Sequence, residues 1–472
     1  MVPNPRRRRS APIRGSLRGC ESPQGDFAQS LPRVYSPRLA ALLTVLTLSL
    51  AAPVAAQDTT TVVRLRATYE VGDLSGFVVL PFAGGGELAE AAAATAEIVR
   101  RDLDFSDQFK MAAAAGARAG EPLNLGLWRE RGADWVLTGT LTPRAGGSTL
   151  RLALHDAVYG QSKGEGSFDL PAPSDRRFRM AVHAASDAVV RWASGEPGIA
   201  ATRIAFVTQG RGSKEIYLVD SDGENATRVT SDGSIALSPA WSPDGGRIAY
   251  TSYRGGVPAL YERDLGTGAD RVLSNREGLN ITPSYAPDGR TVAFATSVGG
   301  NTEVATVGSG GFRAHTSGRR SDSLSPSFSP DGSRIAFVSD RLGEPQIYVM
   351  SAGGGEARLV SDYTYGNRGY STSPDWSPTG GRIAFHTRVS GAHQIAMVEA
   401  DGNRPRLLTS GNRNEDPSWA PNGRHLVFAS PDRDGGGLFV LDTKTGRVRK
   451  LISGRGHGLP DWSPVLVRAA GR

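Results

Sequence analysis

Residues 238–250 read SPAWSPDGGRIAY, and this stretch decides the fold because the chain repeats it. Further copies are TPSYAPDGRTVAF (282–294), SPSFSPDGSRIAF (325–337), SPDWSPTGGRIAF (373–385), DPSWAPNGRHLVF (416–428) and the incomplete LPDWSP (459–464). Successive copies are 44, 43, 48, 43 and 43 residues apart, measured between their second prolines. Periods of about 40–45 residues with four strands in each unit are typical of β-propeller blades.

Each repeat predicts four antiparallel strands, A to D. The segment around the aromatic residue predicts strand A, and the Pro-Asp-Gly after it predicts a tight turn, because proline fixes φ and glycine accepts positive φ. The alternating Arg-Ile-Ala-Phe segment predicts strand B, and strands C and D follow. Residues 203–231 contain strands B, C and D without an A, whereas 459–464 contain an A without a B. We therefore predict six blades, closed by pairing Asp461-Trp462 with the strand at 203–206.

The connectivity of such blades sorts their loops onto two faces. The A–B and C–D turns share one face, and their repeated sequences indicate a structural role. The B–C and D–A loops share the other face and vary in sequence. The longest D–A loop, 362–373, carries three tyrosines and an arginine, residues that are frequent in protein contacts. Packing against a neighbouring loop explains the same residues equally well.

The N-terminal segment is predicted to be a secretory signal. Residues 39–52, LAALLTVLTLSLAA, are apolar, follow Arg33 and Arg38, and precede small residues that predict cleavage after Ala56. The net charge of the chain is +7, but residues 1–56 carry eight arginines and only two acidic residues. The remaining chain has 46 basic and 45 acidic residues, so its charge gives no argument for nucleic-acid binding. We expect a periplasmic protein with a long extension before its signal.

Residues 58–197 lack the repeat. Strands are predicted at 76–82, 134–140 and 149–155, and amphipathic helices at 87–103, 121–131 and 175–194. The alternation of strands and helices predicts a small α/β domain. The predicted organisation is multidomain: a signal with its extension (1–56), a flexible segment (57–66), the α/β domain (67–197) and an all-β six-bladed propeller (198–467), closed by the C-terminal strand.

Motifs of catalytic chemistry are missing from the sequence. It contains no Gly-x-Ser-x-Gly elbow, Walker A motif, His-Glu-x-x-His motif or dinucleotide fingerprint after a strand. The only cysteine, Cys20, lies in the predicted extension, and the seven histidines are scattered. Residues 220–225, DSDGEN, resemble half of a calcium loop, but they lie where the repeats place an Asp-Gly turn, so a plain turn is predicted. We predict that the protein is not an enzyme and needs neither cofactor nor metal.

Taken in order, these segments resemble the TolB family, the periplasmic component of the Tol–Pal system. The resemblance extends over nearly all the chain after the signal. Besides the PxWSPDGxxIAF repeats, it is carried by Val78–Phe82, Asp102-Leu103 to Phe109, Ala133-Asp134 through Thr142-Pro143, Thr202–Phe206 and Pro460–Pro464.

The resemblance implies a monomeric adaptor that associates with membranes through its partners. TolB-like proteins bind the outer-membrane lipoprotein Pal across the propeller mouth and the inner-membrane-anchored TolA through the segment after the signal. They serve outer-membrane integrity and its invagination during cell division. By position, Leu279 and Leu324-Ser325 match the Pal-contacting residues of the family. The D–A loop residues that we predict to contact a Pal-like partner are Leu279, Asn280, Leu324, Ser325, Tyr363, Tyr365, Arg368, Tyr370, Asn414 and Glu415. The TolA-contacting set lies within Gln57–Arg66 and comprises Thr59, Thr60, Thr61, Val62, Val63 and Arg64.

The sequence departs from the family pattern at the Pal-contacting loops. Better-known members place a histidine and a Thr-Glu pair there, whereas this chain has Leu279 and Leu324-Ser325. Two other functions stay open: a secreted propeller enzyme or glycan-binding module that uses the pore, and a repeat scaffold with an unknown partner. A pore enzyme would need convergent histidines or carboxylates on the inner strands, and the sequence offers few.

Overall fold

The computed structural model describes residues 74–298, 300–318, 320–361 and 369–467. The predicted signal, 1–56, and the predicted TolA-contacting segment, 57–66, lie outside the described residues. Among the residues that are described, no helix is both long enough and apolar enough to cross a membrane.

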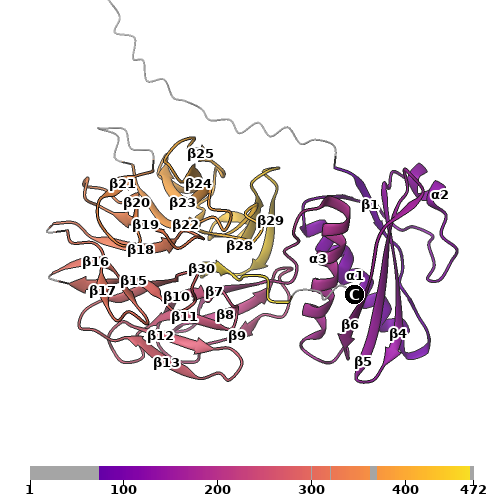
Figure 1. The fold of residues 1–472 in the computed structure, drawn as a ribbon, viewed down its shortest axis with the longest axis horizontal. Coiled ribbons are helices and arrows are strands. Elements are labelled where there is room, and N and C mark those ends of the chain that lie inside the picture. Colours follow the sequence, from indigo (N-terminus) through magenta and orange to yellow (C-terminus); the bar gives the residue numbers. More distant parts are fainter. Residues whose placement is uncertain (1–73, 299, 319, 362–368, 468–472) are drawn as a thin grey trace, which may run out of the picture. The chain divides into compact units, whose positions relative to one another are not determined.

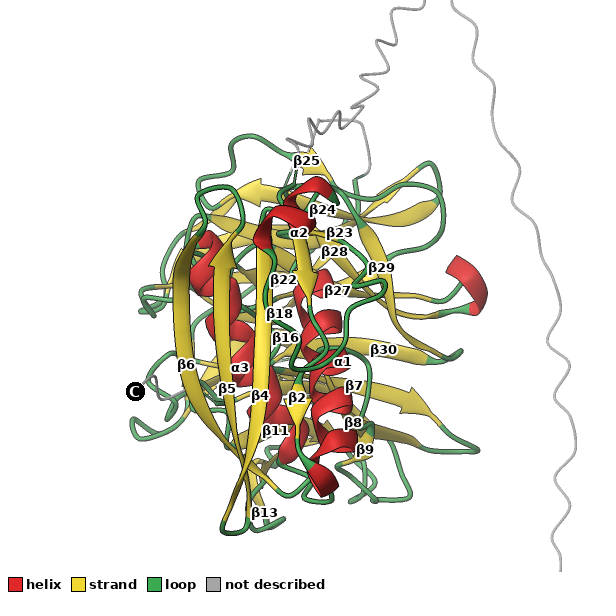
Figure 2. Ribbon diagram, turned by 90° about the vertical axis from the view of Figure 1, so that its right-hand side faces the viewer, coloured by secondary structure: helices red, strands yellow, loops and turns green. Residues whose placement is uncertain are grey.

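The first described domain is an α/β sandwich of two layers, a sheet and a pair of long helices (Figure 2). The sheet order is β3-β1-β4-β5-β6, with β2 beside β4; β3, β1 and β4 are parallel, and β4, β5 and β6 are antiparallel. Its elements are β1 (Gly76–Val79), β2 (Ala83–Gly84), η1 (Gly86–Leu88), α1 (Ala89–Phe105), β3 (Lys110–Met111), α2 (Leu125–Glu130), β4 (Trp135–Arg144), β5 (Gly147–Asp156), β6 (Gln161–Pro171) and α3 (Phe178–Ser194).

Helices α1 and α3 cover one face of this sheet and bury its core. Val99 and Leu103 of α1 and Val189 of α3 are fully buried with Leu150, Leu152 and Leu154 of β5. Strand β6 was not predicted, because Gly164 and Gly166 lower its strand propensity. Helix packing requires them: a Cβ at Gly164 would come within 2.6 Å of the Trp192 ring on α3.

The second domain consists of six four-stranded antiparallel sheets, as predicted (Figure 1). Five are continuous in sequence: β10 (Ala236–Trp241), β11 (Arg247–Ser252), β12 (Ala259–Asp264), β13 (Asp270–Ser274); β14 (Asn280–Tyr285), β15 (Val292–Val298), β16 (Asn301–Val307), β17 (Arg313–Ala314); β18 (Ser323–Phe328), β19 (Arg334–Ser339), β20 (Gln346–Ser351), β21 (Ala357–Leu359); β22 (Ser371–Trp376), β23 (Arg382–Val389), β24 (Ala392–Glu399), β25 (Arg406–Leu407); and β26 (Glu415–Trp419), β27 (His425–Ser430), η2 (Arg433–Gly435), β28 (Gly437–Asp442), β29 (Val448–Ser453).

The sixth sheet joins the two ends of the propeller. Its order is β30 (His457–Trp462), β7 (Arg203–Gln209), β8 (Lys214–Asp220) and β9 (Thr227–Arg228). Asp461 pairs with Ala205 and Trp462 with Ile204, which confirms the predicted closure. The Trp462 indole N–H donates to Thr202 Oγ1 at 2.8 Å. Figure 1 shows the last strand (yellow) beside β7 (magenta).

The two domains contact each other through the A–B and C–D turns of the propeller. Arg424, in an A–B turn, donates to the Asp107 carbonyl at 2.7 Å, and Arg447, in a C–D turn, donates to the Asp107 carboxylate at 2.8 Å. Arg101 of α1 donates to the Asp222 carbonyl at 2.7 Å, in the C–D turn after β8. The turns that the sequence predicted to be purely structural therefore also hold the α/β domain. These contacts leave the B–C and D–A loops on the face that does not bear the α/β domain.

Candidate protein-binding face of the propeller

The six A strands line the central channel of the propeller. Their Ser-Pro-x-aromatic segments surround a cavity of about 260 Å³. In every blade the residue before the proline has a positive φ, between 48° and 53°. These residues are Ser238, Thr282, Ser325, Ser373, Asp416 and Leu459.

The positive φ values mark a bulge in every A strand. The pairing register between strands A and B shifts at this point in all six blades. Positive φ is uncommon for residues other than glycine, and bulges re-aim side chains, often beside functional sites. Each A strand pairs with strand B on both sides of the bulge, so the bulge interrupts the ladder only at the residues that line the channel.

Polar side chains on the A strands also tie neighbouring blades together. Ser327, Asp375, Ser418 and Asp461 occupy the same repeat position, one residue before the aromatic residue. Each accepts the backbone N–H of the next blade's tryptophan: Trp376 at 2.9 Å, Trp419 at 2.7 Å, Trp462 at 3.0 Å and Trp241 at 2.7 Å, respectively. These channel residues therefore hold the ring together.

Carboxylates in the channel have unusual protonation behaviour. Burial raises the pKa of Asp375 to about 6 and, with the negative charge of Asp375 as a second cause, the pKa of Asp461 to about 8. Burial also raises the pKa of Asp416 above its ordinary value. The channel therefore carries fewer negative charges at neutral pH than its three carboxyl groups suggest.

The structure places the predicted D–A loop residues in two environments. Leu279, Leu324 and Ser325 are half-buried. Asn280 and Asn414 are fully buried. The Asn280 amide donates to the Arg276 carbonyl at 2.7 Å, and the Asn414 amide donates to Gln394 Oε1 at 2.9 Å. The two asparagine side chains stabilise the loops in which they lie. Contacts with a partner would therefore be made by other residues of these loops.

Two predicted residues, Tyr370 and Glu415, meet at a histidine that sequence reasoning missed. The His393 ring stacks on Tyr370, with centroids 5.5 Å apart, and its Nδ1 lies 2.7 Å from Glu415 Oε1. On its other side His393 stacks on His386 at 4.8 Å, and Arg388 lies over the Tyr370 ring. This cluster joins the D–A loop before β22 and the β23–β24 hairpin to the first residue of β26 in the next blade. Tyr363, Tyr365 and Arg368, and all six predicted TolA-contacting residues (59–64), lie outside the described residues.

The B–C loops add exposed apolar and cationic side chains to the same face. Val257 and Leu342 are 63% and 48% exposed, and Val389 is 39% exposed. Several loop arginines lie over aromatic rings, among them Arg254 over Tyr261 at 3.6 Å and Arg341 over Tyr348 at 4.5 Å. Stacked arginines and exposed apolar groups are common at protein interfaces. From the sequence, the loops of Arg254 and Arg341 were predicted only to be variable connections.

Two buried groups within the described residues have the composition of metal ligands: Asp102, His183 and Asp222, and Asp107, His425 and Asp442. In each group an arginine pairs with one of the two carboxylates, Arg179 with Asp222 and Arg424 with Asp442. We interpret both as ion-pair clusters between the domains. The sequence predicted Asp222 to lie in a plain turn and gave no functional role to His183 or His425.

The fold and this face define a two-domain protein of the PD40-repeat class of β-propellers. The family model described as the TolB β-propeller domain matches residues 192–466, and the TolB amino-terminal domain matches residues 71–163. The chain therefore belongs to the TolB family, as its sequence motifs predicted.

Comparisons with known proteins agree with this assignment. The Tol-Pal system protein TolB of Polaromonas sp. (strain JS666) is 39% identical over 186 residues, which are 39% of this chain and 43% of that protein. Its namesake in Polaromonas naphthalenivorans is 37% identical over 205 residues, 43% of this chain and 46% of that protein. The matches therefore span less than half the length of these relatives. The crystal structure of TolB from Acinetobacter baumannii superposes with a TM-score of 0.73 at 29% identity, covering 83% of this chain and 97% of that chain.

The relatives carry the names of Tol–Pal system components and not of enzymes. Membership of this family bears out the prediction of a non-catalytic protein.

Proposed function

We propose that this protein is the periplasmic adaptor of a Tol–Pal system. It links an outer-membrane lipoprotein of the Pal type to an inner-membrane protein of the TolA type, and so serves outer-membrane integrity and invagination during cell division. The observation that carries the proposal is the match of both domains, in order, to the TolB family. The proposed periplasmic location rests on the predicted signal. In this proposal the mature chain begins at Gln57 and acts as a monomer.

The face proposed for Pal is formed by the B–C and D–A loops. The described contacts with the α/β domain lie on the opposite turns, so this face is accessible in the docked molecule. Leu279, Leu324, Ser325, Tyr370 and Glu415 stay in the proposed contact set. Val257, Leu342 and Val389 extend it, because their exposed apolar groups gain the most from burial against a partner.

A capture experiment tests this face. Purified mature chain is immobilised, and binding of the cognate Pal-type lipoprotein is measured. Leu342→Glu places a charge in the proposed contact and is expected to weaken binding at least about tenfold, the equivalent of about 1.4 kcal/mol. Val272→Glu is the matched control: Val272 is 50% exposed, close to the 48% of Leu342, but it lies on β13 away from these loops. Equal affinities of the two variants, or no binding by the folded wild type, would count against the proposal.

A second experiment tests the segment proposed for the TolA-type partner. The segment 57–66 precedes the first described residue, Leu74. Deleting it is expected to abolish TolA binding while leaving the melting temperature and the Pal affinity unchanged. A melting temperature lowered by the deletion would indicate a structural role for these residues, and retained TolA binding would exclude the segment as the contact.

A further inference from the structure

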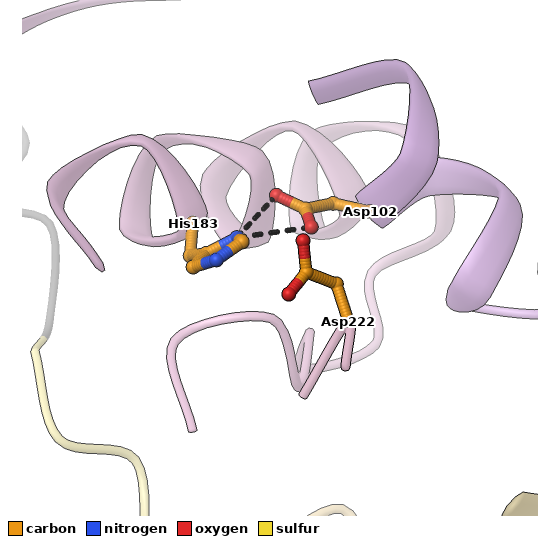
Figure 3. A group of neighbouring side chains, drawn as sticks. All are labelled: Asp102, His183 and Asp222. Carbon is orange, nitrogen blue, oxygen red and sulfur yellow. Dashed lines mark hydrogen bonds and ion pairs between the residues drawn. The ribbon is translucent and has the colours of Figure 1, made fainter. Parts of the chain in front are cut away.

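A fully buried histidine lies where the two domains meet. His183 of α3 has no exposed surface, and its Nδ1 lies 2.8 and 3.0 Å from the two oxygens of Asp102 on α1 (Figure 3). Its Nε2 has no hydrogen-bond partner and lies 4.0 Å from Asp220 Oδ2, at the end of propeller strand β8. The imidazole thus stands between a carboxylate of each domain.

The Asp102 carboxylate has the His183 imidazole as its hydrogen-bonding partner. Two more carboxylates face this histidine, Asp220 and Asp222 of the propeller. Arg179 of α3 pairs with Asp222, and Arg203 of β7 pairs with Asp220 at 2.8 Å. The buried Arg449 acts on Asp222 and on the acidic residues at and just after the end of α1. A proton on His183 supplies the positive charge beside Asp102, and an uncompensated buried charge is costly.

One more titratable group faces the histidine. Asp187, one turn further along α3, accepts the backbone N–H groups of Ala200 at 2.8 Å and Ala201 at 2.9 Å, in the segment that enters the propeller. Burial raises the pKa of Asp187 to about 7, so its deprotonation adds negative charge as pH rises. Any pH effect of Asp187 therefore has the same sign as that of His183.

We propose that a proton on His183 acts as a latch between the α/β domain and the propeller, holding them together at neutral and acidic pH and weakening their contact in mild alkali. The protonated ring donates Nδ1–H to Asp102 and places its second N–H toward Asp220, so the positive charge attracts both domains. Loss of the proton leaves the interface with excess negative charge. The latch concerns how the domains dock and does not depend on the proposed Tol–Pal function.

The direction of the effect follows from the shift of the His183 pKa and its causes. Asp102 and the propeller carboxylates overcome the effect of burial and raise this pKa from 6.5 to about 8. Asp102 belongs to the same domain as His183, so only the attraction to Asp220 and Asp222 depends on docking. The proton is lost as pH rises through about 8, and the ratio of docked to undocked molecules is expected to fall by at least about threefold between pH 6 and pH 9.

A distance measurement in the mature chain tests the latch. The sequence after residue 56 has no cysteine, so Lys163→Cys in the α/β domain and Arg290→Cys in the propeller give one dye site in each. Single-molecule energy transfer then reports the docked fraction at each pH. His183→Gln keeps a donor toward Asp102 but cannot carry charge, and it is expected to give a low docked fraction that retains only the small change due to Asp187 from pH 6 to pH 9. A wild type whose docked fraction is independent of pH, or a His183→Gln variant that keeps the wild-type change, overturns the proposal.

Two controls separate the latch from general damage to the interface. His425 is buried at the same interface, 3.2 Å from Asp107 Oδ2, but burial lowers its pKa, the opposite direction from that of His183. His425→Gln is expected to keep the full pH dependence of docking, and Asp187→Asn is expected to keep most of it. Loss of the pH dependence in either variant contradicts the assignment to His183. If His183→Gln fails to fold, an NMR titration of wild-type His183 decides instead, because a pKa at or below 6.5 is incompatible with the latch.

Discussion

At the residue scale, Asp461 combines a structural hydrogen bond with an unfavourable charge. Its carboxylate accepts the Trp241 N–H at 2.7 Å, and burial together with nearby Asp375 raises its pKa to about 8. In the unfolded chain the same group ionises near 3.8. Because the folded protein disfavours the ionised form, this residue makes the protein progressively less stable as pH rises from about 4 to about 8.

We therefore predict that Asp461→Asn stabilises the protein at pH 7.5. The asparagine oxygen can still accept the Trp241 N–H, while the charge is gone. The melting temperature is expected to rise by about 2–4 °C, the shift that about 1 kcal/mol gives in a domain of this size, and to change little at pH 4. Differential scanning calorimetry at the two pH values measures both effects.

An exposed turn residue gives a control of opposite sign. Hydrogen bonds from Ser242, the Gly246 N–H and Arg247 lower the pKa of Asp244 to about 2. Its ionised form stabilises the protein above about pH 4, and this contribution is lost as pH falls through about 2. Asp244→Asn should therefore lower the melting temperature at pH 7.5. A destabilised Asp461→Asn would show that the carboxylate charge is needed for the channel ring.

At the scale of elements, β30 is the strand on which closure of the ring depends. It pairs with β7, and Trp462 reaches Ser418 in one direction and Thr202 in the other. A chain that ends at Gly456 lacks this strand and leaves one edge of β7 without a partner. An open edge pairs readily with other chains.

We predict that the chain ending at Gly456 forms oligomers or aggregates, while a chain ending at Val467 remains monomeric. Size-exclusion chromatography with light scattering distinguishes the two outcomes. A monomeric product with the melting temperature of the full chain would contradict the closure role of β30.

Strand order and closure could be predicted because local rules set them. The repeated Ser-Pro-Asp-Gly turns fix each A–B hairpin, and the missing A and B strands at the two ends identify β30 and β7 as partners. Strand β6 could not be predicted because its glycines make room for Trp192, a residue on another element. The burial of Asn280 and Asn414 could not be predicted for a similar reason. Their hydrogen-bond partners are loop carbonyls and Gln394, which the local sequence pattern does not identify.

At the scale of the whole molecule, sequence patterns gave no indication of the domain interface. Asp107 and His425 are 318 residues apart, and neither belongs to a motif that predicts the other. The role of Asp104 and Asp107, at and just after the end of α1, is visible only in the folded chain, where Arg447 and His425 lie beside them. Such long-range ion pairs depend on three-dimensional placement, which one sequence does not reveal.

Asp107 is the residue on which this interface depends most directly. It is 2% exposed, its φ is 53°, and its carboxylate accepts from Arg447 at 2.8 Å and lies 3.2 Å from His425 Nε2. Asp107→Ala would leave the buried His425 and the exposed Arg447 without this partner and place an alanine at an unfavourable φ. Leaving a buried hydrogen-bonding group without its partner costs about 1–3 kcal/mol, so domain docking should weaken.

We predict that Asp107→Ala splits thermal unfolding into two calorimetric transitions, one for each domain, whereas the wild type unfolds in one. Asp107→Asn is the matched variant, because asparagine tolerates positive φ and keeps an acceptor for Arg447 while losing the charge. It is expected to retain a single transition at a lower temperature. Two transitions already present in the wild type would mean that the domains unfold independently, and an unchanged single transition in Asp107→Ala would mean that other contacts couple them.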